Sequence, residues 1–497
     1  MAEAATAKTL GQLPPEMVEF TLLKTAGALT PRLGRLSLAG RKTILTPAFI
    51  GNTSRGVIPH ISQDNFRKSV DVGGVYVPLE DFVEKHPQQV PPMLKYDSAE
   101  ALRKFIALPE DRLLVLGARR NPPMPVPLPN TNSEIALSTS VGFKAVSSEY
   151  YAAAARKLQP DIVVALADIP FGQETVGIKR KDKMSDRTEQ WLRDLVAQKD
   201  ALAPDEKRWS IFAPMLPIDR HLQSWYLEHL LDDMVDKVSG IAMYDSSLLH
   251  DLPDELHHLP RLSFDAPASP HELLRQASLG MDLFTVPFVA DATDAGIVLD
   301  FSFPPPSKDA SSSTRHSLGI DMWHPEHATS SMPLSPGCTC YACTNHHRAY
   351  LQHLLAAKEM LGWVLIQIHN HATLSSFFSN LRASIDAGTF DSDVASFEAY
   401  YEPALPEKTG QGPRVRGYQF RSEERANKGR KNPRVYRKFD EAKIAELKAA
   451  HAQQPERNKE IKDVIDDDAL LGLMGLEEGH VDRVRIEDDD DCRVELV

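Results

Sequence analysis

The chain contains few cysteines and no long apolar segment, and each absence excludes a class of protein. Only four cysteines occur in 497 residues, and three of them lie within residues 338–343. This distribution does not suit a disulfide scaffold and is typical of a protein in a reducing compartment. No run of about 18 apolar residues occurs, so the sequence predicts no transmembrane helix. Residues 1–15 lack the basic and apolar regions of a secretory signal, so we expect no secretory leader.

The chain also lacks the G-x-G-x-x-G motif after a strand, which argues against a dinucleotide-binding fold. Its length and its 42% of hydrophobic residues suffice for a large core. The net charge of −13 argues against a simple nucleic-acid-binding domain, although the charge is unevenly distributed.

Composition divides the chain into three parts. We expect a flexible N-terminus over residues 1–15, one large domain over 16–405 and a charged extension over 406–497, which is basic over 414–438 and acidic over 463–497. Aromatic residues interleave with cations in the basic part, a pattern that suits a phosphate backbone. A solvated linker is the alternative. The candidate RNA-binding residues are Arg414, Arg416, Arg421, Lys428, Arg430 and Lys431.

Helical and strand patterns alternate from residue 148 onward. The expected helices cover 148–158, 186–199, 221–237 and 270–278, and the expected strands cover 161–166, 209–215, 240–244, 262–265 and 281–286. Asp186 and Glu189 are spaced as a capping box at the start of the second helix. The alternation predicts a parallel sheet, and over this length it favours an α/β fold of the (β/α)₈ TIM-barrel type.

Acidic residues follow several of the predicted strands. In a barrel, the chemistry takes place at the carboxyl ends of the strands. Asp168, Asp245 and Asp265 occupy such positions and are candidates for acid/base roles. The alternative is that each aspartate caps the next helix.

The clustered cysteines predict a metal site. Cys338, Cys340 and Cys343, together with one histidine, would form a closed tetrahedral shell for a structural Zn²⁺ in an inserted subdomain over about residues 336–390. An incidental cluster or a redox site is the alternative. Spacing alone leaves the histidine open among His346, His347, His353, His369 and His371. His369 follows an apolar run over 363–368 and precedes a predicted helix over 372–387.

The three cysteines and a histidine 26 positions after the last of them resemble the zinc site of the tRNA-guanine transglycosylase family. The flanking segments 348–351 (Arg-Ala-Tyr-Leu) and 369–370 (His-Asn) are similar to those of the family, and 280–284 (Gly-Met-Asp-Leu-Phe) resembles its Gly-Val-Asp-Met-Phe. The resemblance covers roughly residues 20–390. It implies that His369 is the fourth ligand of one Zn²⁺ per chain and that the barrel carries the zinc subdomain as an insertion.

The chain departs from the family at its catalytic positions. The family's aspartate nucleophile corresponds to Thr285, and its general acid/base segment has no counterpart. The base-binding Phe-Asp-Glu-Cys is similar to residues 166–169, where the first acid is lost, and Tyr244 takes the place of the last glycine of Gly-Gly-Leu-Ala-Val-Gly. This pattern resembles the family's non-catalytic subunit, of fungal type, and implies no catalytic residue in this chain.

The resemblance further implies a heterodimer with a catalytic subunit. That pair exchanges guanine for queuine at wobble position 34 of tRNAs with GUN anticodons, those for Asp, Asn, His and Tyr. A cytoplasmic location follows, with peripheral association with the mitochondrial outer membrane as a further expectation. Two alternatives stay open: an active transglycosylase that uses Asp282, Asp168 or Asp245, and a zinc-stabilised RNA-binding module without a role in base exchange.

Overall fold

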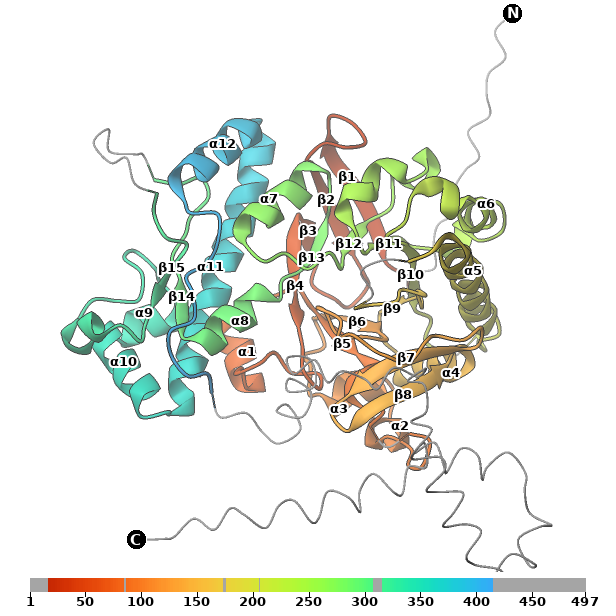
Figure 1. Cartoon of the computed structure of the whole chain (residues 1–497), viewed down its shortest axis with the longest axis horizontal. Coiled ribbons are helices and arrows are strands. Elements are labelled where there is room, and N and C mark those ends of the chain that lie inside the picture. Colours follow the sequence, from red (N-terminus) through yellow and green to blue (C-terminus); the bar gives the residue numbers. More distant parts are fainter. Residues whose placement is uncertain (1–16, 85, 173–175, 205, 307–314, 414–497) are drawn as a thin grey trace, which may run out of the picture. The chain divides into compact units, whose positions relative to one another are not determined.

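Eight parallel strands of the chain close into a barrel (Figure 1). The computed structural model describes residues 17–84, 86–172, 176–204, 206–306 and 315–413. The barrel strands follow one another in chain order: β4 (Ala48–Asn52), β5 (Gly74–Pro78), β6 (Leu113–Gly117), β9 (Ile162–Val164), β10 (Ser210–Met215), β11 (Gly240–Met243), β12 (Arg261–Ser263) and β13 (Leu283–Thr285). Leu283 of β13 pairs with Ala48 of β4 and closes the ring. The predicted TIM-type barrel is confirmed.

Helices lie outside the barrel strands (Figure 1). They are α1 (Gln63–Ser69), α2 (Pro92–Lys95), α3 (Ala101–Phe105), α4 (Ser148–Leu158), α5 (Ile178–Asp200), α6 (Ser224–Asp233), α7 (Pro270–Ser278) and α8 (Phe288–Ala295). Each barrel strand alternates its side chains between two apolar layers, as the period of two in a strand requires. Val115 and Phe212 point into the barrel interior, whereas Leu114 and Ile211 pack outward against the helices. A hairpin of β7 (Glu134–Thr139) and β8 (Gly142–Ser147), which the sequence did not predict, lies between β6 and α4.

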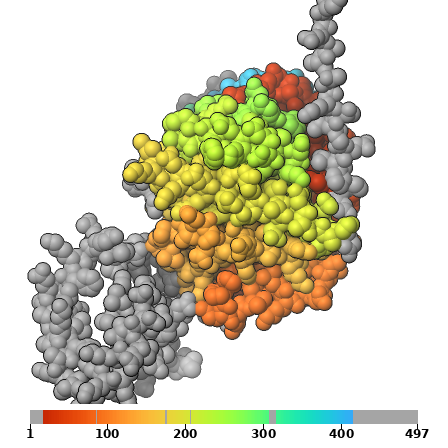
Figure 2. Space-filling model, turned by 90° about the vertical axis from the view of Figure 1, so that its right-hand side faces the viewer, coloured from red at the N-terminus to blue at the C-terminus, as the bar shows by residue number. Residues whose placement is uncertain are grey.

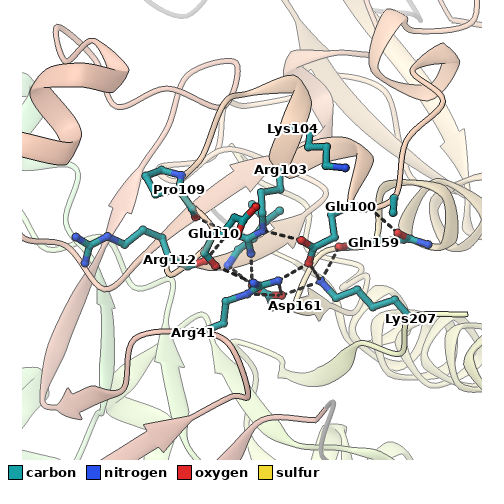
Figure 3. A network of polar contacts seen from close by, with 12 residues as sticks. Arg41, Glu100, Arg103, Lys104, Pro109, Glu110, Arg112, Gln159, Asp161 and Lys207 are labelled. Carbon is teal, nitrogen blue, oxygen red and sulfur yellow. Dashed lines mark hydrogen bonds and ion pairs between the residues drawn. The ribbon is translucent and has the colours of Figure 1, made fainter.

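The amino ends of the barrel strands are held by buried ion pairs. Asp161, directly before β9, accepts hydrogen bonds from Arg41 (3.0 Å), Arg103 (2.6 Å) and Lys207 (2.9 Å), and Glu100 joins the same group (Figure 3). Burial alone would raise the pKa of Asp161, but the three cations outweigh it and hold that pKa below its ordinary value. The network joins four segments that are distant in sequence.

An antiparallel sheet of β1 (Glu19–Thr25), β2 (Arg32–Ser37) and β3 (Ile44–Thr46) precedes the barrel. Arg32 of β2 forms a buried ion pair with Asp282, and the Arg261 backbone N–H donates to the same carboxylate at 2.8 Å. Asp282 lies just before β13, so this pair also anchors the amino end of a barrel strand.

The chain after α8 adds further elements. They are β14 (Ile297–Leu299), β15 (Gly319–Asp321), α9 (Tyr341–Asn345), α10 (Arg348–Ala356), α11 (Met360–Ala387) and α12 (Phe390–Tyr400). Those from β14 to the first half of α11 have a core of their own, whereas the second half of α11 and α12 pack into the core of the barrel. We call the part from β14 to the first half of α11 the metal subdomain. Its core includes Val298, Met322, Leu351 and Trp363, so it draws on residues well before position 336.

Two predicted helix starts are wrong. The helix expected from Asp186 begins at Ile178, because residues 178–185 contain no glycine or proline and consist mostly of good helix formers. Asp186 therefore lies inside α5 and does not cap it. The apolar run 363–368 and the helix expected from 372 are one continuous helix, α11, so His369 projects from the middle of that helix. Within the described residues, no helix is long and apolar enough to cross a membrane.

Candidate functional site

Four side chains from two separate segments meet in the metal subdomain. Cys338, Cys340 and Cys343 come from the loop before α9 and from α9 itself, and His369 comes from α11. Their ligand atoms all lie within 4.8 Å of one another, and within the described residues no other group of three or more His, Cys, Asp or Glu has such an arrangement. The local fold supplies part of this geometry, because Cys340 caps α9 and its Sγ accepts from the Cys343 N–H at 3.4 Å.

The distances fit a tetrahedral metal ion. The Nδ1 atom of His369 lies 3.6 Å from Cys338 Sγ, 3.6 Å from Cys340 Sγ and 3.2 Å from Cys343 Sγ. A tetrahedral ion with metal–sulfur bonds of about 2.3 Å and metal–nitrogen bonds of about 2.0–2.1 Å has a sulfur–nitrogen edge of about 3.6 Å. The cluster could therefore hold one metal ion in a shell with no open position.

The opposite ring nitrogen of His369 fixes its orientation. His369 Nε2 lies 2.9 Å from the carbonyl oxygen of Leu299, to which it donates, so Nδ1 keeps its lone pair toward the cysteines. The neighbouring Asn370 binds the same strand: its Oδ1 accepts from the Leu299 N–H at 2.8 Å, and its Nδ2 donates to the Ile297 carbonyl at 3.1 Å. The hydrogen bonds of His369 and Asn370 therefore hold α11 against β14.

The other four histidines have different surroundings. His346 stacks on Tyr350 with ring centroids 5.2 Å apart, and His347 caps α10 by accepting from the Tyr350 N–H at 3.2 Å. His353 is exposed. His371 is buried against the barrel, where its Nε2 lies 3.2 Å from Gln367 Nε2, and burial lowers its pKa to about 4. The structure thus brings His369 alone among the five to the cysteines.

Thr285 ends β13 at the carboxyl end of the barrel, which we call the barrel mouth. The side chain is fully buried. Its hydroxyl donates to the Ser263 carbonyl oxygen at 2.8 Å and accepts from the Asn121 side-chain amide. Neither partner is a base, and both capacities of the hydroxyl are used, so nothing at this position activates it as a nucleophile.

The candidate aspartates are held in ion pairs or caps. Asp168 is fully buried and binds Arg180 through both oxygens, with Arg187 at 3.1 Å. Asp245 accepts from the Ser247 N–H at 2.9 Å and caps the short helix that follows, as the capping alternative expected. Asp265 accepts from Ser246, and Asp282 lies at the opposite end of the barrel in the pair with Arg32 described above.

Aromatic rings fill the centre of the barrel mouth. Tyr244 stacks on Phe264 with centroids 5.3 Å apart, and Tyr76 meets the same ring edge-on at 5.0 Å. Burial raises the pKa of Tyr244 to about 12, so its hydroxyl stays protonated at neutral pH. Tyr244 was identified in the sequence only as a departure from a glycine, and its position in space shows that the substitution occupies volume at the mouth.

Comparison with known proteins places most of the described region in one family. The family model described as queuine tRNA-ribosyltransferase matches residues 28–403. A protein of Schizosaccharomyces pombe named queuine tRNA-ribosyltransferase accessory subunit 2 is 36% identical over 380 residues, which cover 76% of this chain and 83% of the relative. Proteins of the same name from Xenopus tropicalis and Gallus gallus are 28% identical over 406 residues and 27% identical over 409 residues, covering 72% and 73% of this chain and 94% and 93% of the relatives.

Proposed function

This chain belongs to the queuine tRNA-ribosyltransferase family, and we propose that it acts there as the non-catalytic subunit of a heterodimer. The names of its relatives describe an accessory subunit, which implies a catalytic partner. In this proposal the pair exchanges guanine for queuine at wobble position 34 of tRNAs with GUN anticodons. The catalytic subunit supplies the nucleophile, and this chain helps to hold the tRNA.

The environment of Thr285 carries the proposal. A nucleophile at this position needs an ionised or activated oxygen that is open to the substrate. Thr285 instead has a buried hydroxyl with two hydrogen-bond partners, and neither is acidic. The stacked rings of Tyr244 and Phe264 fill part of the barrel mouth. A subunit in which the chemistry has been replaced by packing accounts for both observations.

We propose Zn²⁺ as the metal of the Cys338, Cys340, Cys343 and His369 group, with one ion per chain. Three thiolates and one imidazole are the ligands of structural zinc sites, and the closed shell suits a stabilising role. The ion would hold the loop of the cysteines to α11. It takes no part in base exchange in this proposal.

The metal subdomain offers a surface for the catalytic partner. Its apolar side chains Met332, Tyr341, Met360 and Leu361 are between 42% and 52% exposed, and they lie on the cysteine loop and at the ends of α9 and α11. Exposed apolar and aromatic side chains gathered on one subdomain are typical of a protein interface. We therefore expect the heterodimer contact to include this subdomain.

Two further parts of the proposal depend on the sequence. Arg414, Arg416, Arg421, Lys428, Arg430 and Lys431 lie outside the described residues, and their proposed role is to bind tRNA phosphates. We also propose a cytoplasmic location, with peripheral association with the mitochondrial outer membrane as its extension.

A base-exchange assay tests the proposal directly. Incorporation of labelled guanine into a tRNA with a GUN anticodon is measured for this chain alone, for the catalytic subunit alone and for the mixture. We expect activity only when the catalytic subunit is present, and co-elution of the two chains in gel filtration. A covalent tRNA adduct trapped on this chain alone would favour the alternative of an active enzyme using Asp168, Asp245 or Asp282. Failure of the two chains to associate would contradict the subunit role.

A further inference from the structure

The first turns of α5 concentrate positive charge beside the barrel mouth. Residues 178–183 read Ile-Lys-Arg-Lys-Asp-Lys, and the first turn has no acidic residue. The buried residues of α5 begin only at Met184: Ile178, Lys179, Asp182 and Lys183 are exposed, and Arg180 and Lys181 are half-buried. The helix itself follows β9, whose carboxyl end belongs to the mouth. Figure 2 shows the face of the molecule on which α5 and α6 lie, in yellow and yellow-green.

The cations of this segment differ in what they contact. Arg180 and Arg187 neutralise the buried Asp168 and are therefore structural. The side chains of Lys179, Lys181 and Lys183 make no hydrogen bond or ion pair within the part of the chain that the structure describes. Three lysines are thus available to a partner on the first two turns of one helix, Lys179 and Lys183 on one face and Lys181 on the opposite one, on a chain whose net charge is −13.

The lysines at the start of α5 destabilise the helix locally. The amino end of a helix carries a partial positive charge, and cations in the first turn cost about 0.3–1 kcal/mol each at an exposed site. The same end has unpaired backbone N–H groups that bind anions. An anionic partner would relieve the repulsion among the lysines and would also satisfy the helix end.

A groove with an aromatic wall lies next to the lysines. Arg119, Leu128, Phe171 and Arg180 are among its lining residues. The Arg119 guanidinium lies over the Phe171 ring, 5.0 Å from its centroid, and its terminal nitrogens donate to the Ile169 and Ala136 carbonyls and to Asn130 Oδ1, which fixes it in the wall of the groove. Ile178, at the start of α5, is 71% exposed. Cationic and aromatic side chains in one groove are the groups that bind phosphates and stack on unpaired bases.

We propose that the start of α5 and this groove form a contact surface for the phosphate backbone of RNA. Lys179, Lys181 and Lys183 bind phosphates, and the Arg119–Phe171 pair receives an unpaired base or a sugar. The proposal rests on the function proposed above, because tRNA is the polyanion that the complex would handle. RNA suits this surface better than an anionic membrane does, since the groove recedes between side chains whereas a bilayer offers a flat face.

Salt-dependent binding of a GUN-anticodon tRNA transcript to the full chain tests the surface. The variant combines Lys179→Ala, Lys181→Ala and Lys183→Ala. The matched control combines Lys68→Ala, Lys95→Ala and Lys104→Ala, three exposed lysines at the ends of α1, α2 and α3. Each phosphate contact contributes about 0.7–0.9 to the slope of log affinity against log salt, so the variant should lower that slope by about 2–3. The control removes the same charge and should change it much less.

Each outcome of this experiment supports or overturns the proposed RNA contact at the start of α5. A smaller slope for the variant alone, with an unchanged thermal midpoint, supports the proposal. Equal slopes for the variant and the unmodified chain, or no RNA binding by the unmodified chain, would overturn it. Loss of binding to phosphatidylserine vesicles with unchanged RNA binding would assign the surface to membranes instead. The subunit proposal fails separately, if the unmodified chain does not associate with the catalytic subunit.

Discussion

Thr285 takes part in the packing of the barrel mouth through both hydrogen bonds of its hydroxyl. Replacing it by valine keeps the shape but leaves the Ser263 carbonyl and the Asn121 amide without this partner. We expect the variant to lose about 1–3 kcal/mol of unfolding free energy, measured in denaturant titrations. Base exchange by the heterodimer should stay near that of the unmodified complex. A complex that assembles normally but loses exchange would show that Thr285 takes part in the reaction.

Asp161 is the centre of the charge network at the amino end of the barrel. Asp161→Asn removes the buried carboxylate shared by Arg41, Arg103 and Lys207 and leaves them only Glu100, which is 25% exposed. Removing one member of a buried pair typically costs about 3–5 kcal/mol. Asp97→Asn is the matched control, because Asp97 is almost fully exposed in its pair with Lys157 and should cost less than about 1 kcal/mol. Equal losses for the two variants would contradict the structural role.

The same carboxylate predicts a pH dependence of stability. The pKa of Asp161 is lower in the folded chain than its ordinary value. The stabilisation is therefore fully present above the unfolded pKa of about 3.9 and is lost as the pH falls through the folded pKa. Unfolding free energy measured from pH 6 down to acid should fall more steeply for the unmodified chain than for Asp161→Asn.

At the scale of elements, α11 joins the metal subdomain to the barrel. His369 on this helix meets the cysteines, and two residues later His371 packs against Phe49 of β4, with ring centroids 5.8 Å apart. A ligand lost from the metal group should thus loosen the cysteine loop without unfolding the barrel. Metal binding is coupled to folding in such sites.

Cys340→Ser tests this element. We expect the purified variant to lose its bound metal, measured by elemental analysis, and to become sensitive to proteolysis between residues 330 and 360. Cys492→Ser is the control, because this fourth cysteine is far from residues 338–343 in the sequence. Metal content that remains equal in both variants would refute the assignment of the ligands.

At the scale of the whole molecule, the chain has a negative net charge but contains a strongly basic segment. Residues 414–438 contain ten Lys or Arg and two Glu. Deleting this segment should leave the thermal midpoint of the barrel unchanged and lower the salt slope of tRNA binding. When the deletion is combined with the α5 lysine variant, the two reductions in the salt slope should add if the two segments bind separate phosphates. An unchanged slope would show that the segment is only a linker.

Local patterns predicted much of the architecture. The alternation of strands and helices from residue 148 favoured the barrel, because the period of hydrophobic residues reports which face of each element is buried. The same patterns misplaced the start of α5, where Asp186 and Glu189 have capping spacing inside a helix. They also divided α11 in two. Helix ends depend on which turns find partners in three dimensions, and spacing alone does not contain that information.

The sequence by itself predicted the three cysteines of the cluster and, through the family resemblance, a threonine at the position of the family's aspartate, Thr285. Spacing left the choice of the fourth ligand open among five histidines, since a ligand is chosen by distance in space. The placement of α11 against β14 brings His369 to the cysteines and directs His371 to the barrel. Tertiary structure alone also decided the roles of the aspartates. Asp168, Asp245 and Asp282 have the same carboxylate, and only their neighbours make them a buried pair, a helix cap and an anchor at the far end of the barrel.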